Sequence, residues 1–211
     1  MLKVTPTQKI MVIVAKYKEK VDWIKNQNTI PYVVYDKNGV IPNVGRESDT
    51  YLRYIIEHYE KLPERMFFLQ GNPFEHFNHS VTKSNIIQKI KDHQFKGYFE
   101  PLYPDRPNCR MGNKFYISQH WGPWGSVDME PFAEKFFYRK FDRFTFCPGA
   151  QFVVSRQAVT FRRKEFYEKL IKEVNYDVNP LEGHFLERLW QFIFDHTTKD
   201  KITHAPANNV I

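Results

Sequence analysis

The sequence predicts an α/β domain with a largely parallel central sheet. Three short apolar runs alternate with segments whose apolar residues recur at helical spacing. Each run is apolar without interruption, which is typical of strands that are covered on both faces. The chain has 211 residues, 42% of them hydrophobic and 26% charged, which is the composition of a globular protein and the size of one domain.

The first two strands and the short helix between them form a β-α-β unit. Residues 9–15 are an apolar, β-branched run that ends abruptly at Lys16. Residues 21–25 predict a short helix, and residues 31–35 predict a second strand that stops at the turn signal of residues 36–39.

A longer helix and a third strand extend this unit. The helix is expected to begin at a capping Ser48 or Asp49, and its apolar residues recur at spacings of three and four over residues 51–59. Residues 66–69 predict the third strand, which runs directly into the polar residues 70–73.

The remainder of the chain predicts more helices than strands. Residues 97–131 are dense in proline, glycine and aromatic residues, which predicts long surface loops of the kind that hold substrates. The segment from Asp195 onward is polar, and we expect residues 1–211 to be a single domain at the amino-terminal end of a longer chain. Helices are expected at residues 80–92, 132–141, 164–174 and 182–194, and a late strand at residues 150–155.

Charge and cysteine content restrict the partners and the compartment. A net charge of +7 makes a phosphate-bearing partner plausible, but no run of five like charges marks a nucleic-acid-binding arm. The two cysteines, Cys109 and Cys147, form no C-x-x-C pair, which fits a reducing compartment. Since no apolar stretch approaches the roughly 20 residues that cross a bilayer, and no signal peptide precedes the first strand, we expect a cytoplasmic protein without a membrane span.

Three common nucleotide and hydrolase motifs are absent from the sequence. There is no G-x-x-x-x-G-K-[ST] loop, no G-x-G-x-x-G after the first strand and no G-x-S-x-G elbow. The sequence therefore disfavours P-loop nucleotidases, dinucleotide-dependent dehydrogenases and ordinary α/β-hydrolases.

Polar residues follow each of the three predicted strands. Because ligands of open α/β sheets bind outside the carboxyl ends of the strands, we expect these residues to lie along one edge. Tyr17 could stack on a base, Asp36 could accept a hydrogen bond from a base or ribose, and Lys16 and Arg46 could neutralise a diphosphate. The alternative is that each is an ordinary loop residue. The three polar segments are Ala15-Lys16-Tyr17, Asp36-Lys37 and Gln70-Gly71-Asn72.

A longer pattern spans most of the chain. It consists of VAKYKE at residues 14–19 with Trp23, PNVGRESDTYLRYII at residues 42–56, FFLQGNP at residues 67–73 with His76, GAQFVVSR at residues 149–156 and LERLW at residues 186–190.

In order and spacing, this pattern resembles a widespread family of uncharacterised domains over roughly residues 10 to 195. That family is in turn similar to the nucleotide-sugar-dependent glycosyltransferases of the GT-A fold. The resemblance implies a single α/β/α sandwich with a mixed, mainly parallel sheet. It also implies transfer of a hexosyl or deoxyhexosyl group from a donor, a UDP-linked sugar, to an acceptor hydroxyl of a glycan. Similarity to viral enzymes that glycosylate capsids implies a capsid glycoprotein as acceptor and the host-cell cytoplasm as location.

The resemblance also implies which residues hold the donor. The polar segments at the three strand ends, together with Arg46, become the nucleotide-sugar pocket. In the GT-A fold a D-x-D motif after the third strand binds Mn²⁺ or Mg²⁺, but the matching place reads Gln70-Gly71-Asn72. Since amides carry no charge they should bind the metal weakly, and the implied ligands are Asn72, Glu75 and His184. Lys16 and Arg46 could partly replace the metal.

An inverting transfer needs a carboxylate that removes the acceptor proton. Glu187 matches the region where related folds place this base, and Asp128 is its rival. Glu187 could instead form a salt bridge with a neighbouring cation, and a retaining enzyme could lack such a base. Trp121 and Trp124 could stack on acceptor sugars or could anchor their loop to the core.

Two functions of other classes remain open. A nucleic-acid-binding module would explain the positive charge and the aromatic content of 17%, although the scattered charge makes nucleic acid the less favoured partner. A catalytically inactive sugar-binding or assembly domain would explain the missing D-x-D carboxylates.

Overall fold

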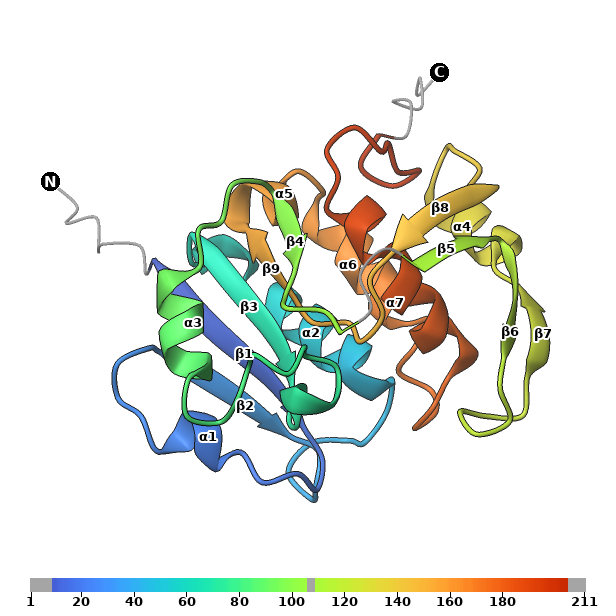
Figure 1. Ribbon diagram of the computed structural model, residues 1–211. Coiled ribbons are helices and arrows are strands. Elements are labelled where there is room, and N and C mark those ends of the chain that lie inside the picture. Colours follow the sequence, from blue (N-terminus) through green and yellow to red (C-terminus); the bar gives the residue numbers. More distant parts are fainter. Residues whose placement is uncertain (1–8, 106–108, 205–211) are drawn as a thin grey trace, which may run out of the picture.

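A mixed five-stranded sheet with helices on both faces forms the centre of the fold (Figure 1). The computed structural model describes residues 9–105 and 109–204. The strand order is β2-β1-β3-β9-β4, in which β1 pairs in parallel with β2 and β3, while β9 pairs antiparallel with β3 and β4. The predicted α/β class with a mixed, mainly parallel sheet is confirmed. The strands are β1 (Ile10–Lys16), β2 (Tyr32–Asp36), β3 (Arg65–Gln70), β4 (Phe99–Pro101) and β9 (Phe152–Ser155).

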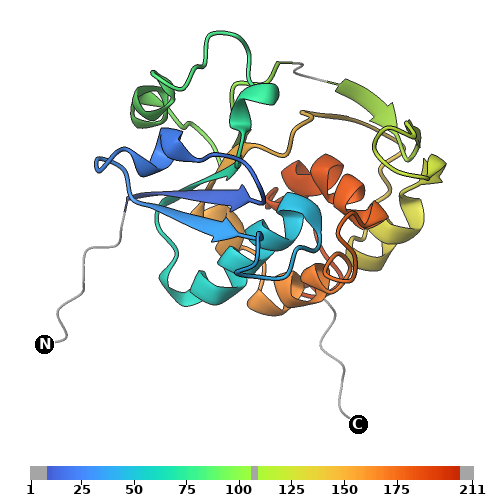
Figure 2. The same cartoon turned by 90° about the horizontal axis from the view of Figure 1, so that it is seen from below.

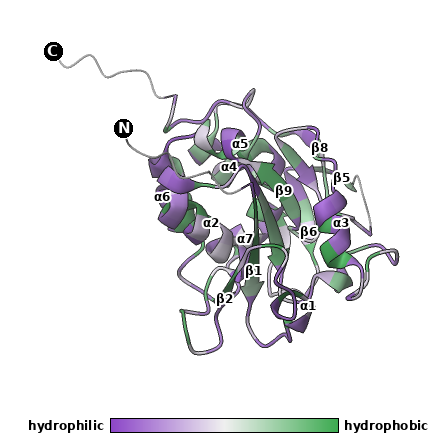
Figure 3. Cartoon of the chain, turned by 90° about the vertical axis from the view of Figure 1, so that its left-hand side faces the viewer, coloured by the Kyte–Doolittle hydropathy of each residue, from purple (hydrophilic) through white to green (hydrophobic). Residues whose placement is uncertain are grey.

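The central strands β1, β3 and β9 are buried on both faces, so that the sheet separates two hydrophobic cores. Along β3, Phe67 and Leu69 belong to one core, whereas Met66 and Phe68 belong to the other, because successive side chains point to opposite faces. Helices α1 and α3 lie on one side of the sheet and α2 on the other (Figure 2). The hydrophobic colour concentrates on the central strands (Figure 3). The helices are α1 (Asp22–Lys25), α2 (Arg46–His58), α3 (Ile86–Asp92), α4 (Glu130–Phe136), α5 (Arg156–Thr160), α6 (Lys164–Ile171) and α7 (Leu181–Ile193), with 3₁₀ turns η1 (Tyr59–Lys61) and η2 (Pro73–Glu75).

Helix α2 begins earlier than its sequence predicts. Ser48 and Asp49 do not cap the helix; both are fully buried within its first turns. The capping position belongs to Gly45, whose φ of 66° is left-handed and therefore suits glycine. A Cβ at Gly45 would lie 2.6 Å from the Cβ of Asp49, so no larger residue fits this turn.

The prediction of long loops over residues 97–131 is wrong, because the segment contains four short strands. Besides β4, it holds β5 (Cys109–Gly112), β6 (Lys114–Ile117) and β7 (Gly125–Asp128). β6 and β7 pair with each other, and β5 pairs with β8 (Arg143–Phe146), which the sequence also missed. Strands of three or four residues are too short to show a period of two, and the partners of β4 and β5 lie far along the chain.

Several helices are shorter than predicted. Only residues 86–92 of the segment 80–92 form α3, because Asn85 accepts a hydrogen bond from the Thr82 amide at 2.8 Å and holds the preceding residues in turns. Helix α4 ends at Phe136, after which Phe137 pairs with Asp200 as an isolated β-bridge. Among the residues that the structure describes, no helix has the length and apolar character required to cross a membrane.

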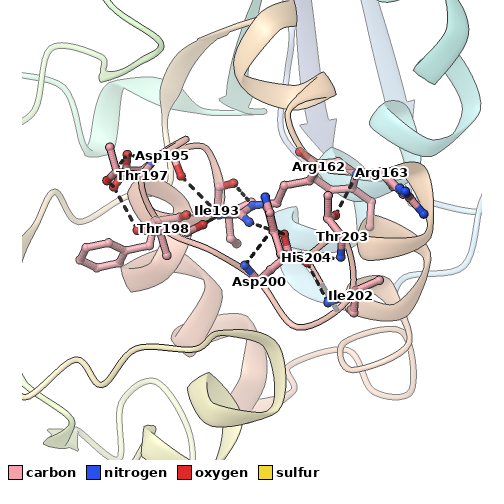
Figure 4. A network of polar contacts seen from close by, with 12 residues as sticks. Arg162, Arg163, Ile193, Asp195, Thr197, Thr198, Asp200, Ile202, Thr203 and His204 are labelled. Atoms are coloured by element: carbon pink, nitrogen blue, oxygen red, sulfur yellow. Dashed lines mark hydrogen bonds and ion pairs between the residues drawn. The ribbon is translucent and has the colours of Figure 1, made fainter. Parts of the chain in front are cut away.

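A buried arginine fastens the carboxyl-terminal segment to the domain (Figure 4). Arg162 is fully buried, and its Nη1 lies 2.5 Å from Oδ2 of Asp200, which is also fully buried. Its Nη2 donates to the carbonyl oxygens of Phe192 and Thr198 at 2.7 and 2.8 Å. Asp200 accepts a further hydrogen bond from the Ile202 amide at 2.9 Å. Each buried charge is therefore both paired and hydrogen-bonded.

We expect Asp200→Ala to lower the free energy of unfolding by about 3–5 kcal/mol, because it leaves the Arg162 guanidinium buried without its counter-ion. Urea denaturation measures the difference. The control is Glu168→Ala, which removes a partly exposed partner 3.9 Å from Lys164 and should change stability by less than about 0.5 kcal/mol. Equal effects of the two substitutions would contradict the assignment of Asp200 as the counter-ion.

Candidate functional site

The carboxyl ends of the three parallel strands meet at one edge of the sheet, as the sequence predicts. Lys16 lies opposite Asp36, and Ala15 lies opposite Gln70. The Nζ atom of Lys16 is 2.6 Å from Oδ2 of Asp36, and this hydrogen bond is the largest cause that lowers the pKa of Asp36. Lys16 and Asp36 therefore largely satisfy each other, which limits what each can offer to a ligand.

The turn that carries Arg46 is held by a buried lysine at the end of β2. Lys37 is 5% exposed, and its Nζ donates to the carbonyl oxygens of Val44 and Arg46. Oδ2 of Asp49 lies 3.7 Å from the same Nζ. Burial lowers the pKa of Lys37, and Asp49 opposes this shift. The contact fixes Gly45 and Arg46, both of which have left-handed φ values, against the edge of the sheet.

A cavity of about 520 Å³, the first cavity, opens at this edge. Its volume lies within the range of small-molecule sites. The lining comes from the end of β3, the start of α2, η2, β5, β6 with the loop that follows it, β8 with the loop that follows it, and α7. Six residues selected from the sequence line it: Arg46, Gln70, Glu75, Trp121, His184 and Glu187.

The other selected residues lie outside the first cavity. Tyr17, with 38% of its surface exposed, stands at the end of β1 under the Nζ of Lys18. Asp128 lies at the end of β7, where Oδ2 is 3.8 Å from Nζ of Lys114. Residues at the sheet edge that do not line the cavity are Ala15, Lys16, Tyr17, Asp36, Gly71 and Asn72.

The segment after β3 is rigidly held. The carbonyl oxygen of Gly71 accepts a hydrogen bond from the Trp23 indole at 3.0 Å. A Cβ at Gly71 would lie 2.8 Å from Oε2 of Glu19, so the carboxylate of Glu19 closes over this position. Asn72 donates from Nδ2 to Oε1 of Glu75 at 2.7 Å. Asn72 and Glu75, two of the implied metal ligands, are thus hydrogen-bonded to each other.

Two arginines surround a buried histidine in the first cavity. Nη1 of Arg46 lies 2.9 Å from Nδ1 and 2.7 Å from Nε2 of His184, and Nη1 of Arg188 donates to the His184 carbonyl oxygen at 2.7 Å. His184 is 4% exposed. Burial, followed by Arg46 and Arg188, lowers the pKa of His184 to about 3. The imidazole is therefore neutral at physiological pH, and the arginines supply the positive charge.

This arrangement does not fit a divalent cation at His184. The ring nitrogens face the Arg46 guanidinium, and the positive charges of Arg46 and Arg188 would repel a metal ion. Across residues 9–105 and 109–204, no group of three or more His, Cys, Asp or Glu residues could hold a metal ion. The same charges suit an anionic group such as a phosphate.

Glu187 lies in the wall of the cavity and is held by two contacts. Oε1 accepts a hydrogen bond from the Gly149 amide at 2.6 Å, and Oε2 lies 3.4 Å from Nη1 of Arg188. The salt-bridge alternative considered for Glu187 is therefore present in the structure. Gly149 has a φ of 102°, and a Cβ there would lie 2.8 Å from the Cβ of His76. Only glycine can bring its amide to Glu187 in this way.

The two tryptophans differ in position. Trp121 is 52% exposed and lines the first cavity, and its carbonyl oxygen accepts a hydrogen bond from Asn179 at 2.8 Å. Trp124 packs edge-on against His184 with ring centroids 4.9 Å apart. A Cβ at Gly122 would lie 2.0 Å from the Trp124 ring. Trp124 thus anchors its loop, whereas Trp121 presents a ring at the rim of the cavity.

The sequence did not identify several polar residues of the lining as candidates. Among them are Asp105, Tyr116 and Arg188. Arg188 directly follows Glu187, and its guanidinium lies 4.2 Å from the centroid of the Phe115 ring. Tyr116 is 64% exposed on β6, whose residues alternate between exposed and less exposed positions. The sequence of β6 gave no signal for Tyr116, because four residues are too few to show a period of two. No local signal identifies Asp105, which the fold brings to the cavity.

We expect the stability of the protein to fall as the pH drops through the range between about 6.5 and 3, because the unfolded state protonates His184 and the folded state does not. Because the pKa of His184 is lower in the folded state than in the unfolded state, the neutral imidazole makes its full contribution to the free energy of unfolding above about pH 6.5. That contribution is lost as the pH falls. Between pH 7 and pH 5, His184 alone should account for about 2 kcal/mol of lost stability.

Urea denaturation of wild type and His184→Gln at both pH values measures this loss. The variant should lose about 2 kcal/mol less than wild type over the same interval, since glutamine does not titrate. An equal loss in both proteins would show that His184 is not held neutral by burial and the two arginines.

Comparison with known proteins gives one match. A sequence family described as "Protein of unknown function (DUF3431)" matches residues 11–209. No curated protein and no solved structure matches the chain.

Proposed function

The chain belongs to the DUF3431 family, and we propose that it is a glycosyltransferase that moves a sugar from a nucleoside-diphosphate sugar to an acceptor hydroxyl. The observation that carries the proposal is the first cavity, in which Arg46 and Arg188 stand beside the carboxylate of Glu187 at the carboxyl edge of the sheet. The resemblance to the GT-A fold supports the same function. It also supports a UDP-linked donor, a cytoplasmic location and a glycan of a viral capsid glycoprotein as acceptor.

Arg46 is proposed to hold the diphosphate of the donor. Its guanidinium lines the cavity. Nε lies 3.8 Å from Oε2 of Glu47, whereas Nη1 faces the neutral imidazole of His184, which does not neutralise the positive charge. The nucleoside would then lie along the edge from Gln70 toward Tyr17, where an exposed aromatic ring is present. Trp121 at the rim would stack on a sugar face.

Glu187 is proposed as the base of an inverting transfer. The acceptor oxygen forms a bond to the anomeric carbon of the donor sugar and gives its proton to the Glu187 carboxylate. The bond between that carbon and the diphosphate oxygen breaks, and its electron pair leaves with the diphosphate. Arg46 stabilises the charge that develops on this leaving group. The Gly149 amide holds the carboxylate in place.

Charge neutralisation by arginine would reduce the need for a metal. Asn72 and Glu75 supply one amide and one carboxylate, already hydrogen-bonded to each other at 2.7 Å. We therefore propose that Mn²⁺ or Mg²⁺ contributes little to donor binding, although the resemblance implies such a cofactor.

The other two function classes receive less support. A nucleic-acid-binding surface needs an open basic track, whereas the cations of the first cavity lie among the carboxylates Glu75, Asp105 and Glu187. An inactive sugar-binding domain is favoured by the amides that replace the D-x-D carboxylates. Measurable hydrolysis of a nucleotide sugar would exclude it.

We expect UDP or a UDP-sugar, at 100 times its Kd, to stabilise the protein by about 2.7 kcal/mol, with a rise in melting temperature of about 5–10 °C. Thermal denaturation with a panel of nucleotides and nucleotide sugars, each with and without Mn²⁺, measures the shift. Mn²⁺ should change the shift little.

Arg46→Gln should abolish most of the shift, because it removes the charge that faces the diphosphate. The matched control is Arg143→Gln on the exposed side of β8, which should behave as wild type. The proposal fails if no nucleotide or nucleotide sugar shifts the transition, or if both variants retain it.

We expect Glu187→Gln to lower sugar transfer or donor hydrolysis by about 10²–10⁴-fold, because glutamine keeps the hydrogen bond from Gly149 but cannot take a proton. Asp128→Asn changes the rival carboxylate, which is exposed and paired with Lys114, and should leave the rate within about twofold. Release of nucleoside diphosphate measures both rates.

The Kd of the donor should change little in either variant. A large loss of rate in Asp128→Asn with an unchanged rate in Glu187→Gln would reverse the assignment of the base.

A further inference from the structure

A second cavity, of about 450 Å³, lies on the other side of Glu187. It is bounded by the edge strand β4, by β8 and β9, and by the end of α7. Seven Phe, Tyr and Trp side chains dominate its lining: Tyr98, Phe99, Phe146, Phe152, Trp190, Phe192 and Phe194.

The two cavities share one wall. Phe146, Glu187 and Arg188 line both of them. The Arg188 guanidinium lies 5.0 Å from the centroid of the Phe146 ring, and Oε2 of Glu187 lies 3.4 Å from Nη1 of Arg188. A molecule in the second cavity would thus meet a carboxylate that also faces the first cavity.

Three other polar side chains of the second cavity are already hydrogen-bonded within the protein, whereas the buried Nε1 of Trp190 has no partner. Gln151 donates from Nε2 to the Pro73 carbonyl oxygen at 3.0 Å, and Gln191 donates to the Thr145 carbonyl oxygen. The carboxylate of Asp195 accepts hydrogen bonds from Thr197 and Thr198. A carbohydrate, which needs many polar partners, would therefore find few of them beyond the shared wall.

The apolar part of the lining is built of closely spaced rings. The centroids of Phe99 and Phe152 are 5.1 Å apart, those of Phe99 and Phe194 are 5.8 Å apart, and Trp190 and Phe194 stack at 5.8 Å. Aromatic rings prefer partners at such separations, and Phe152, Trp190 and Phe194 are at most 1% exposed. A ligand would therefore meet chiefly the rings of Tyr98, Phe99 and Phe192, which are less buried. The cavity volume suits a ligand of one or two fused rings.

We propose that the second cavity binds the acceptor, and that this acceptor is an alcohol with an aromatic body. This inference rests on the proposed sugar transfer, and the acceptor class that it names differs from the glycan that the resemblance implies. The hydroxyl of the aromatic alcohol points at Glu187 and gives its proton to that carboxylate. Its oxygen forms a bond to the anomeric carbon of the sugar in the first cavity, and the bond to the diphosphate breaks with its electron pair.

The probe for this proposal is 2-naphthol, with lactose as the carbohydrate comparison. Titration calorimetry should show saturable binding of 2-naphthol and none of lactose. In NMR spectra of wild type, 2-naphthol should shift the indole N–H resonance of Trp190 more than that of Trp23, which does not line the second cavity and donates its N–H to the Gly71 carbonyl oxygen. This measurement needs no variant.

The variant that fills the second cavity is Thr145→Phe. Thr145 is half-buried on β8 and lines the second cavity but not the first. We expect at least a 10-fold weaker Kd for 2-naphthol, with the nucleotide-sugar Kd unchanged. Thr160→Phe, at an exposed position on α5, is the matched control and should bind both ligands as wild type does.

With a donor sugar present, mass spectrometry should detect the naphthyl glycoside, and Thr145→Phe should reduce its formation by at least 10-fold while donor hydrolysis continues. Donor binding without 2-naphthol binding, or binding of lactose at Trp190, would overturn the aromatic acceptor and leave the proposed function intact. Binding of 2-naphthol by a protein that binds no nucleotide sugar would overturn both the acceptor role and the proposed function.

Discussion

The buried ammonium group of Lys37 is the contact on which the candidate site depends. It joins three parts of the chain: the end of β2, the left-handed turn at Gly45 and Arg46, and the first turn of α2 through Asp49. A buried charge is costly unless it is paired and hydrogen-bonded, and here two carbonyl oxygens and one carboxylate meet that need. Because this contact fixes the backbone of Arg46, the Arg46 guanidinium lies in the first cavity, beside His184 of α7.

The position of the first cavity follows from the topology of the sheet. The chain passes from β1 outward to β2 on one side and then crosses to β3 on the other. Connections that leave a sheet in opposite directions open a crevice at the carboxyl ends of the strands. Gln70 ends β3 at this crevice, and α7 closes it with His184 and Glu187. The loop before the antiparallel strand β9 adds Gly149, whose amide holds the Glu187 carboxylate by a hydrogen bond.

The residues of α7 separate two chemically different spaces. The first cavity contains Arg46 beside neutral His184, together with Gln70 and the carboxylates of Glu75 and Asp105, and it suits a polar ligand with an anionic group at Arg46. The second cavity contains the rings of β4, β9 and the end of α7. Glu187 is the acidic residue common to both linings. A group transfer between a polar donor and an apolar acceptor is the chemistry that this division supports best.

The sequence predicted the parts of this arrangement that depend on local pattern. Uninterrupted apolar runs identified β1, β2 and β3, and parallel strand ends brought Lys16, Asp36 and Gln70 to one edge. It could not predict pairings between distant segments. Lys37 reads as an ordinary turn residue, yet it is buried because the chain folds back over it. Asp105 likewise reaches the first cavity through the tertiary fold alone, and Ser48 gave a false cap because Gly45 supplies the left-handed turn.

The central claim is that the first cavity binds a nucleoside diphosphate through Arg46. A crystal structure of the protein with UDP tests it most directly. The account predicts the diphosphate within hydrogen-bonding distance of the Arg46 guanidinium, with the base along the edge between Gln70 and Tyr17. Well-defined UDP bound elsewhere on the protein, with the first cavity empty, would contradict it.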